Sequence, residues 1–320
     1  MNRFVIMVIL ISLNLFSACP VAQSERIENY FIGKDRQAPV LFSFDAIDER
    51  TIQAIFDESI SSCSAHTEES VNLPATLDER EVRVTLQEAL PPGEQILLTL
   101  RVEDRSGNTT TLSKQISGIN TRLPEVQLNE FTTQGTKTQP DRIELAVLSD
   151  GNLAGIHIYD GMYLNHTSLF VFPSCEVKAG DYVVLQYSVE DNLHDHPHFF
   201  YAGEEGLGGS NGVISVYRNS TPAIIDALPY SDRINDSDTD YGGFGTAQVF
   251  QEVQELEEYA IWEASPIQPG NSVRSDYTTS TRSINRREGE SPVFNAEQWY
   301  TVPTGSLSFS QENCSEQYNP

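Results

Sequence analysis

Three histidines, His194, His196 and His198, stand at alternate positions of one short segment. Side chains alternate along an extended strand, so the three imidazoles would point to one side of the chain. Three imidazoles with a fourth position left open are the usual ligands of a catalytic zinc ion. The spacing therefore supports the hypothesis of a metal-binding protein or a metal-dependent enzyme.

The same segment also fits a polar loop on the surface of a β-rich domain. Zinc ligands of a catalytic site rarely stand so close together in one loop, and no distal carboxylate can be assigned to complete the set. We therefore assign no metal ligand, no catalytic residue and no cofactor, and we expect that the chain is not an enzyme. The histidine cluster remains the alternative hypothesis.

Two further motifs match known sites only in part. Asp236, Asp238 and Asp240 resemble the start of an EF-hand calcium loop, but tyrosine and alanine stand where the loop requires glycine and glutamate. Residues 208–212 match G-x-S-x-G around Ser210, yet a strand-like run follows the serine and all six histidines precede it. We interpret the first motif as a solvated acidic turn and the second as a flexible hairpin turn.

The first eighteen residues differ in composition from the rest of the chain. Arg3 precedes an apolar run over residues 4–16, which is too short to span a membrane and has the proportions of a signal-peptide core. Ser17, Ala18 and Cys19 follow, in an order that resembles the bacterial lipobox. The resemblance implies cleavage before Cys19 and attachment of lipid to it. The alternative is an ordinary cleaved signal peptide followed by an incidental cysteine.

The chain is strongly acidic, with 46 aspartates and glutamates against 20 lysines and arginines and a net charge of −26. Nucleic acids and anionic lipid headgroups repel such a polyanion. We therefore expect no nucleic-acid partner, and we interpret the acidity as a source of solubility.

Export would place the three remaining cysteines in an oxidising compartment. Cys175 and Cys314 fall in one predicted domain, whereas Cys63 falls in the other. We therefore predict a disulfide between Cys175 and Cys314, with Cys63 left as a free thiol.

Residues 38–120 alternate β-rich runs with turns, which is typical of a sandwich of short strands. The β-rich runs lie at 40–44, 51–56, 82–86 and 96–102. The sequence DRSGNT at 104–109 resembles the D-x-x-G-N-T turn of bacterial immunoglobulin-like domains. That resemblance implies an immunoglobulin-like fold for this part of the chain.

Residues 121–310 contain a second ordered set of β-rich runs, at 126–131, 141–145, 152–158, 169–173, 178–185, 211–216 and 223–230. The set includes Asp226 at the end of a V-I-D-like strand and closes with Arg286, Trp299 and Gly305. In this order and spacing the motifs resemble the lamin tail domain, a small immunoglobulin-like sandwich. The resemblance implies an adaptor that holds other proteins or surfaces.

Residues 247–262 predict one amphipathic helix. Its apolar side chains recur every three or four residues, and its glutamates are expected to decorate the rest of the surface. The apolar positions are Val249, Phe250, Val253, Leu256 and Ala260, and the glutamates are Glu252, Glu255 and Glu258.

The sequence as a whole predicts a mostly β chain built from two tandem immunoglobulin-like β-sandwiches and one short amphipathic helix. The predicted parts are a cleaved signal peptide at 1–18, a flexible tether at 19–37, sandwiches at 38–120 and 121–310, and a tail at 311–320. We expect a lipoprotein of the bacterial cell envelope, periplasmic or surface-exposed, that serves as a non-catalytic binding, adaptor or structural module. Its expected partners are membrane lipid, through Cys19, and an envelope or extracellular protein recognised by residues 190–212.

Overall fold

The computed structural model describes residues 35–69, 72–188, 197–218, 223–233, 239–287 and 294–320. The chain divides into two compact units. Unit 1 contains Met1–Ala89 and Gln95–Ser117, and unit 2 contains Leu90–Glu94 and Gly118–Pro320. The fold is mostly β, as predicted, and the described residues include one α-helix, α3 (Ala247–Tyr259). None of the helices in these ranges is long and apolar enough to cross a membrane.

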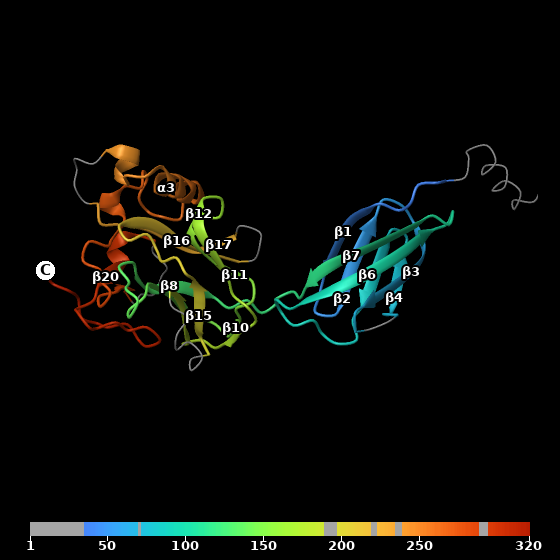
Figure 1. The fold of residues 1–320 in the computed structure, drawn as a ribbon, viewed down its shortest axis with the longest axis horizontal. Coiled ribbons are helices and arrows are strands. Elements are labelled where there is room, and N and C mark those ends of the chain that lie inside the picture. The colour runs from blue at the N-terminus through green and yellow to red at the C-terminus, as the bar shows by residue number, and fades with distance from the viewer. Residues whose placement is uncertain (1–34, 70–71, 189–196, 219–222, 234–238, 288–293) are drawn as a thin grey trace, which may run out of the picture. The chain divides into compact units, whose positions relative to one another are not determined.

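Unit 1 consists of two antiparallel sheets (Figure 1). The first has the order β1 (Leu41–Ala46), β2 (Thr51–Phe56), β5 (Glu81–Thr85) and β4 (Ala75–Asp78). The second has the order β3 (Ile60–Thr67), β6 (Gln95–Asp104) and β7 (Thr109–Ser117). This is the strand order of a constant-type immunoglobulin sandwich. Alternate residues of β2 are fully buried, which is the period of two expected for a strand with one face on the core.

The turn between β6 and β7 explains the D-x-x-G-N-T motif. The backbone N–H and the side-chain amide of Asn108 donate to the Asp104 carboxylate, at 2.8 and 2.7 Å. Gly107 has a φ of 86°, in the left-handed region that favours glycine. Burial of Asp104 opposes ionisation, but hydrogen bonds from Asn108 and from the turn backbone outweigh it and lower the pKa of Asp104.

Unit 2 contains two larger sheets and one short pair, β10 (Gly151–Asn152) and β13 (Glu176–Val177). The five-stranded sheet has the order β12 (His166–Val171), β11 (Ile156–Gly161), β16 (Asn211–Arg218), β17 (Ala223–Ser231) and β18 (Val273–Arg274). The six-stranded sheet has the order β15 (Phe199–Gly203), β14 (Tyr182–Tyr187), β9 (Arg142–Val147), β8 (Val126–Thr132), β19 (Ile284–Arg286) and β20 (Trp299–Thr301). Of the strand pairs described, β14–β15 and β17–β18 are parallel and the others are antiparallel.

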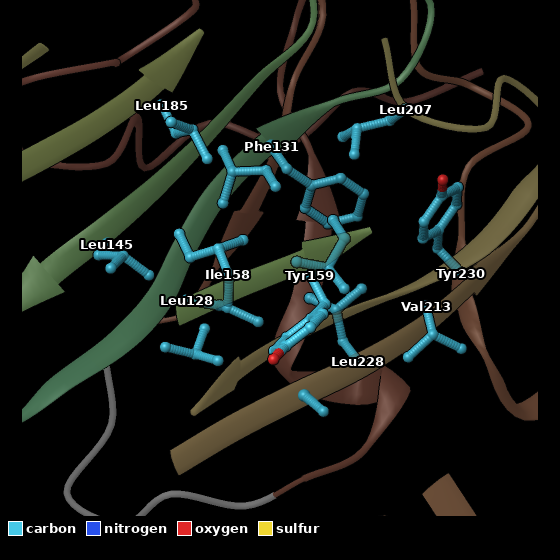
Figure 2. Packing of buried hydrophobic residues seen from close by; sticks show 14 of the residues in the cluster. Leu128, Phe131, Leu145, Ile158, Tyr159, Leu185, Leu207, Val213, Leu228 and Tyr230 are labelled. Carbon is cyan, nitrogen blue, oxygen red and sulfur yellow. The ribbon is translucent and has the colours of Figure 1, made fainter. Parts of the chain in front are cut away.

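The hydrophobic core of unit 2 draws on both large sheets (Figure 2). The six-stranded sheet contributes Leu128, Phe131, Leu145 and Leu185. The five-stranded sheet contributes Ile158, Tyr159, Val213, Leu228 and Tyr230. Two opposed apolar faces of this kind define a β-sandwich.

A buried ion pair joins the two sheets of unit 2. Asp226 on β17 and Arg286 on β19 are 3% and 5% exposed. Arg286 donates from Nη1 to the Asp226 carboxylate and to the carbonyl oxygen of Leu128 on β8, at 3.0 Å for the latter. The N–H of Leu128 donates to the same carboxylate at 2.9 Å. The guanidinium lies 5.3 Å from the ring centroid of Trp299, so the pair also fixes the position of β20.

Helix α3 packs on β16 of the five-stranded sheet (Figure 1). Thr246 caps its start, and Ala260, in the left-handed conformation, ends it. Val253 and Leu256 are buried, but the expectation that the glutamates face solvent is wrong for two of them. Glu252 and Glu255 are only 3% and 5% exposed.

Tertiary contacts account for both buried glutamates. Glu255 accepts hydrogen bonds from the N–H groups of Leu164 and Asn165 and from the Asn165 side chain, at 2.8–3.0 Å. The charge of Asp160 on β11 acts on Glu252. Burial, together with the charge of Asp160, raises the pKa of Glu252 to about 8. Burial, together with the charge of Asp141, raises the pKa of Asp160 to about 7.

Unit 2 is expected to lose stability as the pH rises from 5 to 8. Asp160 and Glu252 have folded-state pKa values above their ordinary values of 3.8 and 4.5, so their contribution is complete below about pH 4 and is lost as the pH rises through about 7 and 8. The loss between pH 5 and 8 should be on the order of 7 kcal/mol for the two groups, because each pH unit below a raised pKa value changes the free energy of unfolding by about 1.4 kcal/mol. Urea unfolding followed by tryptophan fluorescence measures it, because both tryptophans, Trp262 and Trp299, lie in unit 2.

A Glu252→Gln variant should show a flatter pH dependence, whereas Glu258→Gln, at an exposed position of the same helix, should match the parent chain. If the free energy of unfolding changed with pH equally in the parent chain and in Glu252→Gln, the raised pKa of Glu252 would not be the cause of the pH dependence.

Replacement of Asp226 by asparagine should lower the free energy of unfolding of unit 2 by about 3–5 kcal/mol, because it leaves the Arg286 charge buried without compensation. The same fluorescence measurement applies. The matched control is Glu176→Gln, which removes the carboxylate of an exposed pair with Arg122 and should have a much smaller effect. An Asp226→Asn variant as stable as this control would show that the pair does not hold the sheets together.

Candidate functional site

A pocket of about 320 Å³ opens in unit 2 where β18, β19 and β20 lie near the C-terminal residues Gln317 and Tyr318. Its volume lies within the range of about 300–1,000 Å³ that is common for small-molecule sites. Arginine and aromatic side chains are prominent in its lining. They are Arg274, Arg287, Tyr277, Trp299, Tyr300 and Tyr318.

Each tyrosine of the pocket lies against an arginine. The guanidinium carbons of Arg274 and Arg287 lie 5.0 Å from the ring centroids of Tyr277 and Tyr300. Arg282, just outside the lining, lies 4.2 Å from the ring centroid of Tyr318. Such contacts are attractive and restrict the orientation of the guanidinium, while its in-plane N–H groups stay available to an anion.

The two arginines that line the pocket differ in whether a carboxylate neutralises their charge. Arg274 forms a two-point pair with Asp276, and this hydrogen bond raises the pKa of Arg274. Arg287 donates from Nε to the carbonyl oxygen of Glu297 at 2.9 Å, and no salt bridge to a described carboxylate neutralises it. Of the two arginines that line the pocket, Arg287 is therefore the one without an ion pair to a carboxylate in the described part of the chain.

The position of these arginines contrasts with the charge of the surrounding domain. Residues 118–320 contain 29 aspartates and glutamates against ten lysines and arginines. Four of those ten lie within fourteen consecutive positions, at Arg274, Arg282, Arg286 and Arg287. A local cluster of arginines thus stands within a domain that is acidic overall, although Arg274 and Arg286 are paired with Asp276 and Asp226.

Buried polar contacts hold the C-terminal segment against unit 2. Glu130 accepts from the N–H and the hydroxyl of Ser308 at 3.0 and 2.8 Å, and Glu144 accepts from the N–H of Ser310 at 2.5 Å. Burial raises the pKa of Glu144 to about 8. Further along, the N–H of Tyr318 donates to the carbonyl of Thr301 on β20 at 2.8 Å. The segment predicted as a tail at 311–320 therefore packs on unit 2.

Of the three histidines singled out in the sequence, His198 is described and lies just before β15. Its Nε2 is 3.9 Å from a carboxylate oxygen of Asp181. His194 and His196 lie outside the described residues, as do residues 190–196 of the recognition segment expected at 190–212. Its remaining residues, 197–212, are described and contain β15 and the start of β16. Cys19 and the segment 1–34 that contains it also lie outside them.

A group of three carboxylates occurs in unit 1. Oxygens of Asp35, Glu58 and Asp104 lie within 4.8 Å of one another. Burial and the charges of its acidic neighbours raise the pKa of Glu58. Since Asp104 already accepts the hydrogen bonds of the β6–β7 turn, we assign this group to the turn.

The G-x-S-x-G motif lies at a strand entry. Ser210 is exposed and is followed directly by β16, where a nucleophile elbow would need a helix. Of the acidic motif, Asp240 begins a short 3₁₀ helix ahead of α3, and Asp236 and Asp238 lie outside the described residues.

The predicted disulfide is not formed in this structure. Cys63, Cys175 and Cys314 are free cysteines. The thiol of Cys175 lies near the carbonyl of Pro197, just before β15, whereas the carbonyl of Cys314 accepts from the Tyr300 hydroxyl on β20. β15 and β20 are the opposite outer strands of the six-stranded sheet, so the two cysteines lie at opposite edges.

Sequence reasoning missed the pocket. Its residues come from β18, β19, β20 and the C-terminal segment, so no contiguous motif marks it. The available signal was the run of arginines at 274–287 in a domain with few other basic residues.

Comparisons with known proteins identify the family to which the chain belongs. No curated protein matches the chain. Among solved structures, the N-terminal part of the bacterial S-layer protein SbsC matches the chain with a TM-score of 0.23 and 12% identity. The match covers 65% of this chain and 46% of that chain, so it spans less than half of the SbsC chain. A likeness this weak supports no conclusion about function. A family model described as a protein second domain, TP_1001_2nd, matches residues 124–197 and 187–301, which together span more than half of the chain. The chain therefore belongs to the TP_1001_2nd family, and unit 2 is the part that matches it.

Proposed function

We propose that this chain is a lipid-anchored protein of the bacterial cell envelope and that unit 2 is a non-catalytic binding module. The observation that carries the binding role is the Arg287 pocket, a cationic and aromatic site within a strongly acidic domain. Pockets that combine apolar walls with a few convergent polar groups are the usual sites of ligand recognition.

The proposed export and anchoring rest on the first nineteen residues. An apolar run followed by two small residues and Cys19 has the form of a lipoprotein signal. Lipid on Cys19 would hold the chain at a membrane, and several acyl chains hold a protein far better than one. The sandwiches would then stand on the aqueous side of that membrane.

The proposed adaptor role has support from the lamin tail resemblance. Asp226, Arg286 and Trp299 come from separate motifs of that resemblance, and they form one contact network in unit 2. The network has a structural role, because it joins the two sheets next to the pocket. We therefore propose a lamin-tail-like sandwich that displays a binding pocket at one edge.

Anchoring is tested by expressing the full chain in a bacterial host and separating membrane from soluble fractions. The parent chain should sediment with membranes and carry a diacylglyceryl group on Cys19 by mass spectrometry. Cys19→Ser should lose the lipid and leave the membrane fraction, whereas Cys63→Ser should stay there. A mature N-terminus elsewhere, without lipid, would contradict the proposal.

Binding through the pocket is tested with the purified mature chain and isolated bacterial envelopes. Arg287→Ala should weaken sedimentation with the envelopes about tenfold, because charge-assisted hydrogen bonds are the strong ones in such sites. Arg218→Ala, which removes one exposed positive charge from the end of β16, is the matched control and should bind like the parent chain. Equal binding by both variants would exclude the pocket as the binding site.

A further inference from the structure

We propose that the ligand of the Arg287 pocket is an acidic sugar, a ring that carries one carboxylate and several hydroxyl groups. This inference rests on the proposed binding function and names its substrate class. It follows from three properties of the pocket. They are the lining arginine Arg287, which has no ion pair among the described residues, the aromatic walls, and the occupied edge of β20.

The positive charge of Arg287 favours a ligand with a single negative charge. The planar guanidinium of Arg287 is fixed by its stack on Tyr300 and by its bond to the Glu297 carbonyl, which leaves the outer N–H groups for a carboxylate. Arg274 is already neutralised by Asp276, and the acidic residue Glu297 lines the same pocket. The Arg287 guanidinium lies in the same pocket as the Glu297 carboxylate, which would repel a second negative charge on the ligand. The pocket therefore suits a ligand with one negative charge better than a doubly charged phosphate.

The remaining lining suits a hydroxylated ring. Tyr277, Trp299 and Tyr318 provide apolar ring surfaces on which the C–H face of a sugar can pack. Thr301 and Gln317 line the same pocket and have side-chain groups that can both donate to and accept from hydroxyl groups. The walls are held in place, since Trp299 packs edge-on against Phe131 of β8 at 5.7 Å between ring centroids.

The neighbouring sheet edge disfavours an extended peptide. A peptide that adds a strand needs free backbone groups at the edge of a sheet. At the outer strand β20, the N–H of Tyr318 already donates to the carbonyl of Thr301, and the Tyr300 hydroxyl donates to the carbonyl of Cys314. The C-terminal segment of the chain itself thus occupies this edge, so the pocket is open to a compact ring and closed to a pairing strand.

The test uses the fluorescence of Trp299, which lines the pocket. The full mature chain with Trp262→Phe retains Trp299 as its only tryptophan. Titration with galacturonate, which carries one carboxylate, should change its emission in a saturable way, whereas galacturonate methyl ester and neutral galactose should not. Denaturant unfolding of the Trp262→Phe chain first establishes that it folds.

Variants of Arg287 test whether its guanidinium binds the carboxylate of the ligand. Arg287→Ala should weaken the binding of galacturonate about tenfold or more. Arg287→Lys keeps the charge but loses the planar fork and should weaken it to a lesser extent. Arg218→Ala should bind as tightly as the parent chain.

Three outcomes would overturn the sugar assignment. They are no emission change with galacturonate, equal binding of its methyl ester, and binding that Arg287→Ala leaves intact. If inorganic phosphate or a short peptide with a free carboxylate binds through Arg287 instead, the binding function stands and only the sugar assignment fails. If Arg287→Ala retains full binding to envelopes, the proposed function itself fails.

Discussion

The structure of unit 2 depends on the buried ion pair between Asp226 and Arg286. A charge removed from water is costly unless a partner and hydrogen bonds compensate it, and here the Leu128 backbone supplies the additional bonds. Because the pair links β17 with β8 and β19, it fixes the two sheets relative to each other within the unit. The stack of Arg286 on Trp299 extends this constraint to β20 and so to one wall of the pocket.

Charge is distributed unevenly in unit 2. Most of its acidic residues are solvated, but Asp160, Glu144 and Glu252 are buried and have raised pKa values. Two of the ten basic residues at 118–320, Arg274 and Arg287, line one pocket. The net negative charge of the chain therefore predicts long-range repulsion of polyanions. At Arg287, in contrast, the local charge is positive.

Elements with one strongly apolar face could be predicted from the sequence, and elements without such a face could not. β2 and β6 bury alternate apolar residues, and their predicted bounds agree closely with the observed ones. β3 and β7 carry mostly serine, threonine and other polar side chains, so no period of two marks them. They form strands because β6 lies between them and pairs with both. Helix α3 was predicted from its apolar face, but the burial of Glu255 depends on donors about ninety residues away in sequence.

By itself, the sequence determined the mostly β class, the run of sandwich strands and the acidic character, because periodicity and composition are local properties of the chain. Only the tertiary structure decided which polar residues meet. It brought Asp226 to Arg286, placed Cys175 and Cys314 at opposite edges of a sheet, and assembled the pocket from β18, β19, β20 and the C-terminal segment. The physical reason is that strand order and sheet packing set these distances, and neither is encoded in the spacing of residues along one strand.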